Sequence, residues 1–355
     1  MSSEEDLEAQ AREVGLRYVT DEMPGIRRRR RGRGFSYILP SGQVLDDPRQ
    51  RRRIASIAIP PAWSDVWICL LASGHLQATG RDDRGRKQHR YHPLWRQLRD
   101  QRKFHRMRRF GQRLPYLRAA VDGDLRRPTL DRDRVVAAVV RLLETSCIRV
   151  GNEEYRRSNG TYGLTTMRKR HVDFDGSSII VFQFVGKGGQ RQEVKVDDPR
   201  AARVVRRCQE LPGQQLFHYV AEGGELEPVG SGDVNDYIHQ HAGSRYTAKD
   251  FRTWMGTLQA LLALAELGCP EAAPERNRLV VKATDRVAAS LRNTRAVCRS
   301  SYIHPDVFEL YQDGVLLEVA DLASSRPSEW LDAEEVALMR VLRFIDEGRG
   351  VEAVA

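Results

Sequence analysis

Five polar residues between positions 149 and 302 have side chains that together could break and reseal a phosphodiester bond. They are Arg149, Lys187, Arg252, Asn293 and Tyr302. Two guanidinium groups can hold a crowded phosphate, and an amide can donate a further hydrogen bond to a phosphoryl oxygen. A lysine ammonium can protonate a departing oxygen, and a tyrosine hydroxyl can attack phosphorus. The set therefore predicts reversible phosphoryl transfer to a tyrosine.

Each of these residues also has an ordinary structural explanation. Arg149 follows the apolar segment VVAAVVRLLETSCI, where a cation can simply stabilise the end of a helix. Arg252, in KDFRTW, could be a core arginine paired with Asp250. Lys187 lies in GKGG, which is not a P-loop because the upstream glycine and the following Ser or Thr are missing. The five residues become informative only as a set.

Positive charge is concentrated in the first third of the chain. Residues 1–120 hold 26 Lys and Arg against 13 Asp and Glu, whereas residues 121–355 hold 32 against 35. Within the first part, residues 81–118 carry 14 basic and 3 acidic side chains, with Gln, His, Tyr and Trp between them. A solvated helix face usually explains a charge run, but one with so little acid favours a polyanionic partner. The run Arg27–Arg31 fits a phosphate-contacting edge and, alternatively, a nuclear localisation signal.

The first part of the chain has the pattern of a small sheet domain. Residues 33–46 alternate around a PSG turn as a hairpin does, and the arginine run before them leads into this strand. Residues 66–79 predict two more strands with a break at Ser73-Gly74, and 48–58 predict a short helix between the two pairs.

From about residue 95 the apolar residues recur at helical spacing instead. Helices are expected, among others, at 233–242, 247–267, 275–290 and 331–346. Residues 178–184 and 191–196 are the exception, a predicted β-hairpin with Lys187 at its tip. We therefore predict an α+β fold, with a small N-terminal antiparallel β-sheet domain at 1–94 and a larger, mainly α-helical domain with a small hairpin sheet at 95–355.

Composition argues against several other classes. No stretch approaches the roughly 18 apolar residues of a membrane-spanning helix, and the acidic start MSSEEDLEAQ does not resemble a signal peptide. The five cysteines are widely spaced without a CxxC pair, so neither a zinc site nor a redox motif is expected. The expected location is the cytoplasm.

Five segments of the sequence carry a resemblance to a known family. They are GHLQATGRDDRGRKQHRYHPLWRQLRD (74–100), CIRVGNEEYRRSNGTYGLTTMRKRHV (147–172), FVGKGG (184–189), YTAKDFRTW (246–254) and NTRAVCRSSYIHP (293–305). Together they resemble DNA topoisomerase type IB, in its compact poxvirus-like branch as found in bacteria. The likeness covers roughly residues 20–345, and five blocks in the same order make it specific.

The resemblance implies that a small sheet domain and a larger helical catalytic domain, related to that of tyrosine recombinases, close around double-stranded DNA as a C-shaped clamp. It implies a monomer that relaxes supercoiled DNA by transient cleavage of one strand through a 3′-phosphotyrosyl intermediate, strand swivelling and religation. The covalent bond conserves the phosphodiester energy, so neither ATP nor a metal ion is required and no cofactor is expected. The implied location is cytoplasmic, on the nucleoid.

The resemblance also implies a role for each of the five residues. Tyr302, nine residues after Asn293, matches the nucleophile, and Arg149 and Arg252 match the two phosphate-binding arginines. Lys187 matches the general acid for the departing 5′ oxygen, on a hairpin that DNA would order. Poxvirus and nuclear members carry histidine at the position of Asn293. Because an amide cannot supply a cationic donor, transition-state stabilisation from this position is expected to be weaker.

Further residues are implied as DNA contacts. Gln88, His89 and Tyr91 match the base- and backbone-reading segment of the family, with histidine where tyrosine is more common. The other expected contacts with the DNA backbone are Arg81, Arg86, Lys87, Tyr155 and Lys249.

Two alternatives remain open. A site-specific tyrosine recombinase shares the Arg, Lys, Arg and Tyr chemistry, but it normally shows HxxR where this chain has Lys249-Asp250-Phe251-Arg252, and it lacks the GRKQ-type N-terminal block. The second alternative is a noncatalytic protein that binds duplex DNA. Covalent retention of DNA through Tyr302 would distinguish an enzyme from this second class.

Overall fold

The computed structural model describes residues 3–32, 34–83 and 85–352, and for Ser3, Tyr155 and residues 349–352 it describes the backbone only. The chain divides into two compact units, Met1–Lys103 and Phe104–Ala355. Helix α3 (Pro93–His105) runs across this division. The boundary between residues 94 and 95 that the sequence suggests stays a prediction.

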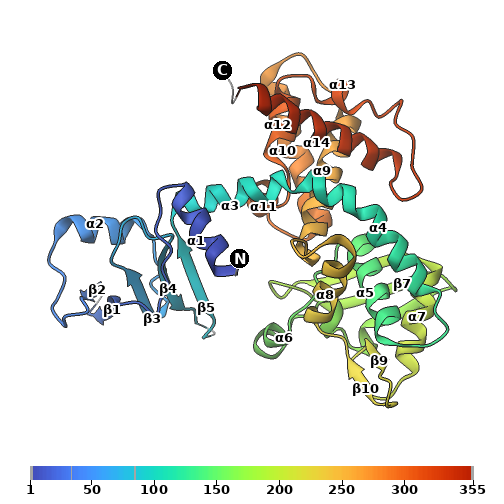
Figure 1. Cartoon of the computed structure of the whole chain (residues 1–355), viewed down its shortest axis with the longest axis horizontal. Coiled ribbons are helices and arrows are strands. Elements are labelled where there is room, and N and C mark those ends of the chain that lie inside the picture. Colours follow the sequence, from blue (N-terminus) through green and yellow to red (C-terminus); the bar gives the residue numbers. More distant parts are fainter. Residues whose placement is uncertain (1–2, 33, 84, 353–355) are drawn as a thin grey trace. The chain divides into compact units, whose positions relative to one another are not determined.

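The first unit is built on a five-stranded antiparallel sheet with the strand order β2-β1-β3-β4-β5 (Figure 1). The strands are β1 (Gly25–Arg31), β2 (Gly34–Ile38), β3 (Ser64–Cys69), β4 (Leu76–Arg81) and β5 (Lys87–Tyr91). On one face, Ile26, Ile68 and Ala78 lie opposite one another and pack against Ile54 of α2 (Pro48–Ser56). Helix α1 (Ser3–Glu13) forms a separate apolar cluster with α3.

The opposite face carries Arg27 and the residues in register with it, Trp67, Thr79 and His89. Trp67 and Thr79 are buried beneath the segment that precedes β1. The Trp67 indole donates to the Met23 carbonyl at 2.9 Å, and the Thr79 hydroxyl donates to an Asp21 oxygen at 3.0 Å. Arg27 and His89 are exposed. This face is therefore covered at its centre and open on both sides of it.

The sequence-based expectations for this unit are partly confirmed. Strands β3 and β4 and helix α2 lie where two strands and a short helix are predicted. The run Arg27–Arg31 does not lead into a strand but is itself β1, because it pairs with β2 on one side and β3 on the other. The hairpin expected at 33–46 is reduced to an isolated bridge between Ile38 and Val44, since β2 takes β1 as its main partner.

The second unit is mainly helical and contains the largest of the described apolar cores. Its helices are α4 (Met107–Leu125), α5 (Arg132–Ser146), α6 (Glu153–Asn159), α7 (Pro199–Glu210), α8 (Ser231–Ala242), α9 (Ala248–Leu267), α10 (Ala273–Leu291), α11 (Arg295–Ser301), α12 (Pro305–Gln312), α13 (Leu316–Ala320) and α14 (Ala333–Glu352). In Figure 1, α5, α7 and α8 lie toward the bottom of the view, and α12, α13 and α14 lie toward the top. Helix α9 contacts α5 and α8 as well as α10, α12 and α14, so it joins the two groups.

Helix α9 is fixed at its start and along its length. The Thr247 hydroxyl accepts from the Lys249 amide, and the Asp250 carboxylate accepts from the Thr247 amide, which forms a capping box. Farther along, the Trp254 indole donates to the buried Glu335 carboxylate of α14 at 2.9 Å. Glu335 also accepts from both terminal nitrogens of Arg118 of α4, at 2.6 and 2.7 Å. These contacts fix the position of α9 within the second unit.

Two small antiparallel sheets complete the second unit. Strands β6 (Val172–Asp175), β7 (Ile179–Val185) and β8 (Arg191–Asp197) form one, and β9 (His218–Val220) pairs with β10 (Leu226–Pro228) in the other. The predicted hairpin is confirmed as β7 and β8, whereas β6, β9 and β10 are not predicted from the sequence. The four helices expected at 233–242, 247–267, 275–290 and 331–346 are α8, α9, α10 and α14. None of the helices in the described part of the chain has both the length and the apolar character needed to cross a membrane.

Candidate active site

Arg252 is held on α9 between the carboxyl ends of two other helices. Its side chain is only 6% exposed. One terminal nitrogen donates to the Cys147 carbonyl, after α5, at 2.5 Å, and the other donates to the Leu291 carbonyl, at the end of α10, at 2.7 Å. The pairing with Asp250 that the sequence left open is wrong, because Asp250 instead accepts from Arg106 at 3.2 Å and caps α9.

This anchoring leaves donors free for a ligand. The carbonyls at a helix end have no partner within the helix and carry partial negative charge, so they attract a guanidinium group. A guanidinium has five N–H donors, and the two carbonyls use one on each terminal nitrogen. The buried Nε of Arg252 has no hydrogen-bond partner among the described residues. Arg252 is therefore held in place while it keeps donors for an anion.

Arg149 lies beside Arg252, three residues after the end of α5. Its Nη2 donates to the Asn293 side-chain oxygen at 2.7 Å. Burial, together with the positive charge of Arg252, lowers the pKa of Arg149 to about 10. A cation whose charge is disfavoured in this way is stabilised by a bound anion. The pair of arginines thus favours a phosphate group.

Asn293 lies in the turn after α10 and faces the two arginines, Arg149 and Arg252. Its Oδ1 accepts from Arg149, and its Nδ2 donates to the Leu291 carbonyl at 3.3 Å. An amide nitrogen has a second N–H, so Asn293 can also donate to an anion held by the arginines.

Tyr302 ends helix α11 and packs against α9. The guanidinium carbon of Arg252 lies 5.0 Å from the centre of the Tyr302 ring. The Tyr302 carbonyl accepts from the Thr257 hydroxyl at 3.3 Å, and Thr257 in turn accepts from the His304 amide at 3.0 Å. Gly256, one turn beyond Arg252, lets this segment approach, since a Cβ atom there would lie 2.6 Å from the Tyr302 carbonyl oxygen. The nucleophile candidate is thus held against the helix that carries Arg252.

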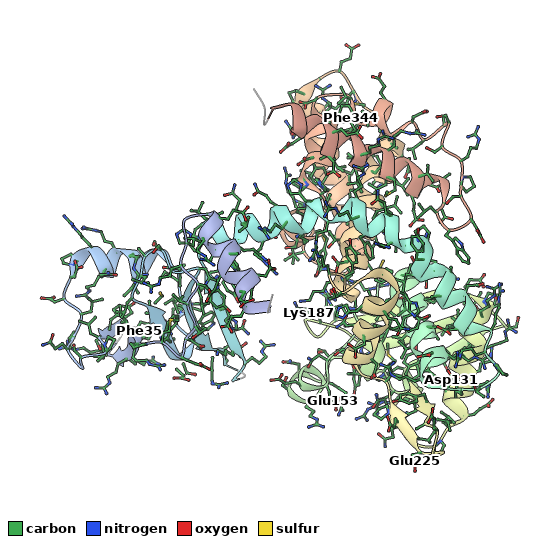
Figure 2. All side chains as sticks on the ribbon, viewed as in Figure 1. Phe35, Asp131, Glu153, Lys187, Glu225 and Phe344 are labelled. Carbon is green, nitrogen blue, oxygen red and sulfur yellow. The ribbon has the colours of Figure 1, made fainter. Side chains whose placement is uncertain are left out.

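Lys187 lies apart from these contacts on the loop between β7 and β8. Gly188 and Gly189 have positive φ angles of 85° and 77°, which a tight turn requires and which glycine adopts without strain. The Lys187 side chain is exposed, and no hydrogen bond or ion pair joins it to another described residue. Figure 2 labels Lys187 on this loop. The structure therefore brings Arg149, Arg252, Asn293 and Tyr302 together, and it leaves Lys187 on an exposed turn.

Arg292 is a member of this cluster that the sequence analysis missed. Its Nη1 donates to the Ser146 carbonyl of α5 at 3.4 Å, and it directly precedes Asn293. The available signal was an arginine at the position after a helix where glycine is common.

In the first unit, several of the predicted DNA contacts share one face of the sheet. Arg81 is paired with Lys87, and both lie on the same side as His89, because side chains alternate along a strand. The rings of His89 and Tyr91 are parallel to within 9°, with centres 5.8 Å apart. Gln88 is opposite Gly80 and lies on the other face. In β5, Lys87, His89 and Tyr91 therefore point to one side of the sheet, and Gln88 points to the other.

Most of the predicted cationic contacts are paired with carboxylates. Lys87 lies 2.7 Å from Asp21, and Arg86 lies 2.6 Å from Asp82, which also accepts from Gln88 at 2.9 Å. Arg81 lies 3.9 Å from Asp65. A pocket of about 230 Å³ on this face is lined by Asp21, Glu22, Arg27, Asp65, Thr79, Gly80, Arg81 and Lys87. The face therefore carries acidic groups among its basic ones.

The other two predicted contacts belong to the second unit. Lys249 is exposed in the first turn of α9. Tyr155 lies in α6, and its side chain is outside the part of the chain that the structure describes.

Two family descriptions match this chain. "Eukaryotic DNA topoisomerase I, catalytic core" matches residues 92–321, and "Bacterial DNA topoisomerase IB, N-terminal domain" matches residues 34–82. The first match includes all five candidate catalytic residues, and the second includes β2, α2, β3 and β4.

Individual proteins are similar over most of their length. DNA topoisomerase 1B of Acanthamoeba polyphaga mimivirus is 32% identical over 298 residues, which is 82% of this chain and 88% of the relative. DNA topoisomerase 1B of Vaccinia virus (strain Copenhagen) is 22% identical over 287 residues, which is 78% of this chain and 86% of the relative. A crystal structure of the XerH site-specific recombinase bound to its palindromic difH substrate matches with a TM-score of 0.37 and 14% identity, over 58% of this chain and 51% of that chain.

Proposed function

The chain belongs to the type IB DNA topoisomerases and relaxes supercoiled DNA, and we propose that it does so through a covalent bond between DNA and Tyr302. The Tyr302 phenolic oxygen attacks the scissile phosphorus, and the bond from phosphorus to the 5′ oxygen breaks. The phenol gives its proton to solvent, and Lys187 gives one to the 5′ oxygen. The free strand swivels, and the reverse reaction reseals it. No ATP takes part, because the phosphotyrosyl bond conserves the energy, and no metal ion takes part, because Arg149 and Arg252 supply the positive charge.

The contact between Arg252 and the Tyr302 ring is the observation that carries this proposal. It joins a buried phosphate-type donor and a candidate nucleophile in one site. Arg252 and Arg149 bind the non-bridging oxygens, whose negative charge grows in the pentavalent transition state, and Asn293 donates an additional bond. A donor of this kind contributes about 3 to 4 kcal/mol to the barrier.

Lys187 acts as the general acid after DNA orders its loop. Its exposure and the glycines beside it support a side chain that can move to the 5′ oxygen. A substrate with sulfur in place of the 5′ oxygen tests this role. A thiol has a pKa of about 8.5, so the thiolate leaves without being protonated. Lys187→Ala is expected to cleave ordinary DNA slowly and the sulfur substrate at the rate of the unmodified protein. Arg252→Ala serves as the control that sulfur does not rescue, and equal rescue of both would refute the assignment.

The face of the N-terminal sheet that carries Arg81, Lys87 and His89 binds duplex DNA. The shared direction of these side chains supports this, together with the excess of basic residues in the first 120 positions. Arg86, Gln88 and Tyr91 belong to the same segment, and Lys249 and Tyr155 add contacts from the second unit.

The protein acts as a monomer on the nucleoid, since a single active site cuts a single strand. Sedimentation with a short duplex is expected to give one protein chain per complex.

Covalent trapping tests the proposal directly. Detergent added to the protein on a labelled duplex, with chelator and without ATP, is expected to trap a complex whose linked peptide contains Tyr302. Tyr302→Phe should give no complex, and Tyr116→Phe, which changes a 63% exposed tyrosine, should behave as the unmodified protein does. A covalent complex in Tyr302→Phe, or a linkage to another residue, would overturn the proposal. Failure of the unmodified protein to trap any DNA that it binds would favour a noncatalytic DNA-binding protein.

A further inference from the structure

Arg292 adopts a backbone conformation that arginine normally avoids. It ends α10 in the left-handed region, with φ 51° and ψ 55°. Glycine is the usual residue at such a helix end, because in this conformation the Cβ of any other residue lies too close to the following carbonyl oxygen. A residue other than glycine in a strained conformation suggests that its side chain has a use.

The Arg292 side chain points toward the site formed by Arg149, Arg252, Asn293 and Tyr302. Its Nη1 donates to the Ser146 carbonyl, in the last turn of α5, three residues before Arg149. Burial, and the charge of Arg252, lower the pKa of Arg292. The charge of Arg292 also contributes to the lowered pKa of Arg149. Three guanidinium groups thus influence one another at this site.

No carboxylate offsets these charges within the described part of the chain. Arg149, Arg252 and Arg292 donate to carbonyl or amide oxygens, and none of the three forms an ion pair with a described Asp or Glu. In contrast, Arg295, three residues beyond Arg292, pairs with Asp285. Uncompensated positive charge in a half-buried site is stabilised when an anion enters it.

We propose that Arg292 is a positioning residue of the active site, which holds the end of α5 and thereby Arg149, and which adds a third positive charge to the phosphate site. This rests on the proposed roles of Arg149 and Tyr302. Arg292 does not touch the reacting atoms. Its loss should slow cleavage on the order of tenfold, less than the 10²- to 10³-fold loss of a donor that contacts a reacting oxygen.

Glycine at this position separates the side chain from the backbone. Arg292→Gly relieves the left-handed strain, so the thermal stability should stay the same or rise. Single-turnover cleavage by this variant should fall about tenfold, with duplex affinity changed less than threefold, because many other cations bind the backbone. Arg292→Lys keeps the charge and should recover most of the cleavage rate. Arg286→Ala, which removes an exposed arginine of the same helix, should leave cleavage unchanged.

Three outcomes would overturn the inference. Cleavage by Arg292→Gly within twofold of the unmodified rate would show that the side chain is not used. A fall in melting temperature that accompanies the loss of cleavage in both Arg292→Gly and Arg292→Lys would indicate a purely structural role. An equal loss in Arg286→Ala would show a general effect of charge. All rates are relative to the unmodified protein, so absence of cleavage in that protein would instead refute the proposed chemistry.

Discussion

Gly256 is the position where a single methyl group should separate stability from activity. It lies in α9, one turn after Arg252, and faces the segment that carries Tyr302. In Gly256→Ala the new Cβ would lie 2.6 Å from the Tyr302 carbonyl oxygen and 3.1 Å from both the Tyr302 Cβ and Leu291 Cδ1. The first of these is a backbone atom and cannot rotate away.

The size of the effect follows from these distances. An ordinary carbon–oxygen contact is at least 3.3 Å, so Tyr302 must move by about 0.7 Å. The helix gains about 1 kcal/mol from replacing glycine by alanine, and overpacking costs about 1 to 3 kcal/mol. The net loss of stability is therefore between about 0 and 2 kcal/mol. A displacement of about 1 Å in a reacting group can cost on the order of 100-fold in rate, so we expect cleavage to fall roughly 10- to 100-fold.

The assay compares single-turnover cleavage with urea unfolding. Gly123→Ala is the matched control, because Gly123 also lies in a helix, α4, and a Cβ there would meet nothing within 4 Å. This control should gain up to about 1 kcal/mol of stability and keep its cleavage rate. Cleavage by Gly256→Ala at the unmodified rate would refute the inferred packing of Tyr302 on α9. Equal loss in Gly123→Ala would show that helix rigidity, not the contact, is responsible.

Three further predictions concern charge. Because burial and the charge of Arg252 lower the pKa of Arg149 to about 10, phosphate binding should raise it again. The affinity for duplex DNA, measured by fluorescence anisotropy, should therefore fall as the pH rises above about 10. In Arg149→Gln the slope of the logarithm of this affinity against pH should be smaller by up to one, because one proton fewer is taken up on binding. Although burial alone would raise it, bonds from Arg118 hold the pKa of Glu335 below its ordinary value. This carboxylate therefore stabilises the fold above pH about 4 and loses that effect as the pH falls through its folded pKa, so Glu335→Ala should cost about 3 to 5 kcal/mol in urea unfolding at pH 7 and less at pH 3. Asp21→Asn should tighten duplex binding, because it frees Lys87 and removes a negative charge near the phosphates, with a stability loss below about 1 kcal/mol. Weaker duplex binding by Asp21→Asn at low salt would contradict this third prediction.

The main elements could be predicted because local patterns determine them. The hairpin that carries Lys187 has β-branched strands around consecutive glycines, and α9 has a capping box followed by a long apolar run. The arginine run was harder, because five like charges do not show strand periodicity. Its place in the sheet depends on Ile26 and on pairing with β2 and β3, which are tertiary features.

The residue types of the site could be predicted, but not their environment. Arg252 is anchored by carbonyls at the ends of α5 and α10, which are 105 and 39 residues away in the sequence. Only the folded chain brings these helix ends together. The left-handed conformation of Arg292 and the close approach at Gly256 likewise depend on packing between distant segments. The carboxylate partners of Lys87 and Arg81 also come from other segments.

Relaxation of negatively supercoiled plasmid tests the central claim most directly. The reaction should contain excess chelator and no ATP, and it should compare the unmodified protein with Tyr302→Phe at equal DNA occupancy. The account predicts that the unmodified protein relaxes the plasmid and that Tyr302→Phe binds it without relaxing it. Relaxation by Tyr302→Phe at a comparable rate, or none by unmodified protein that demonstrably binds the plasmid, would contradict the account.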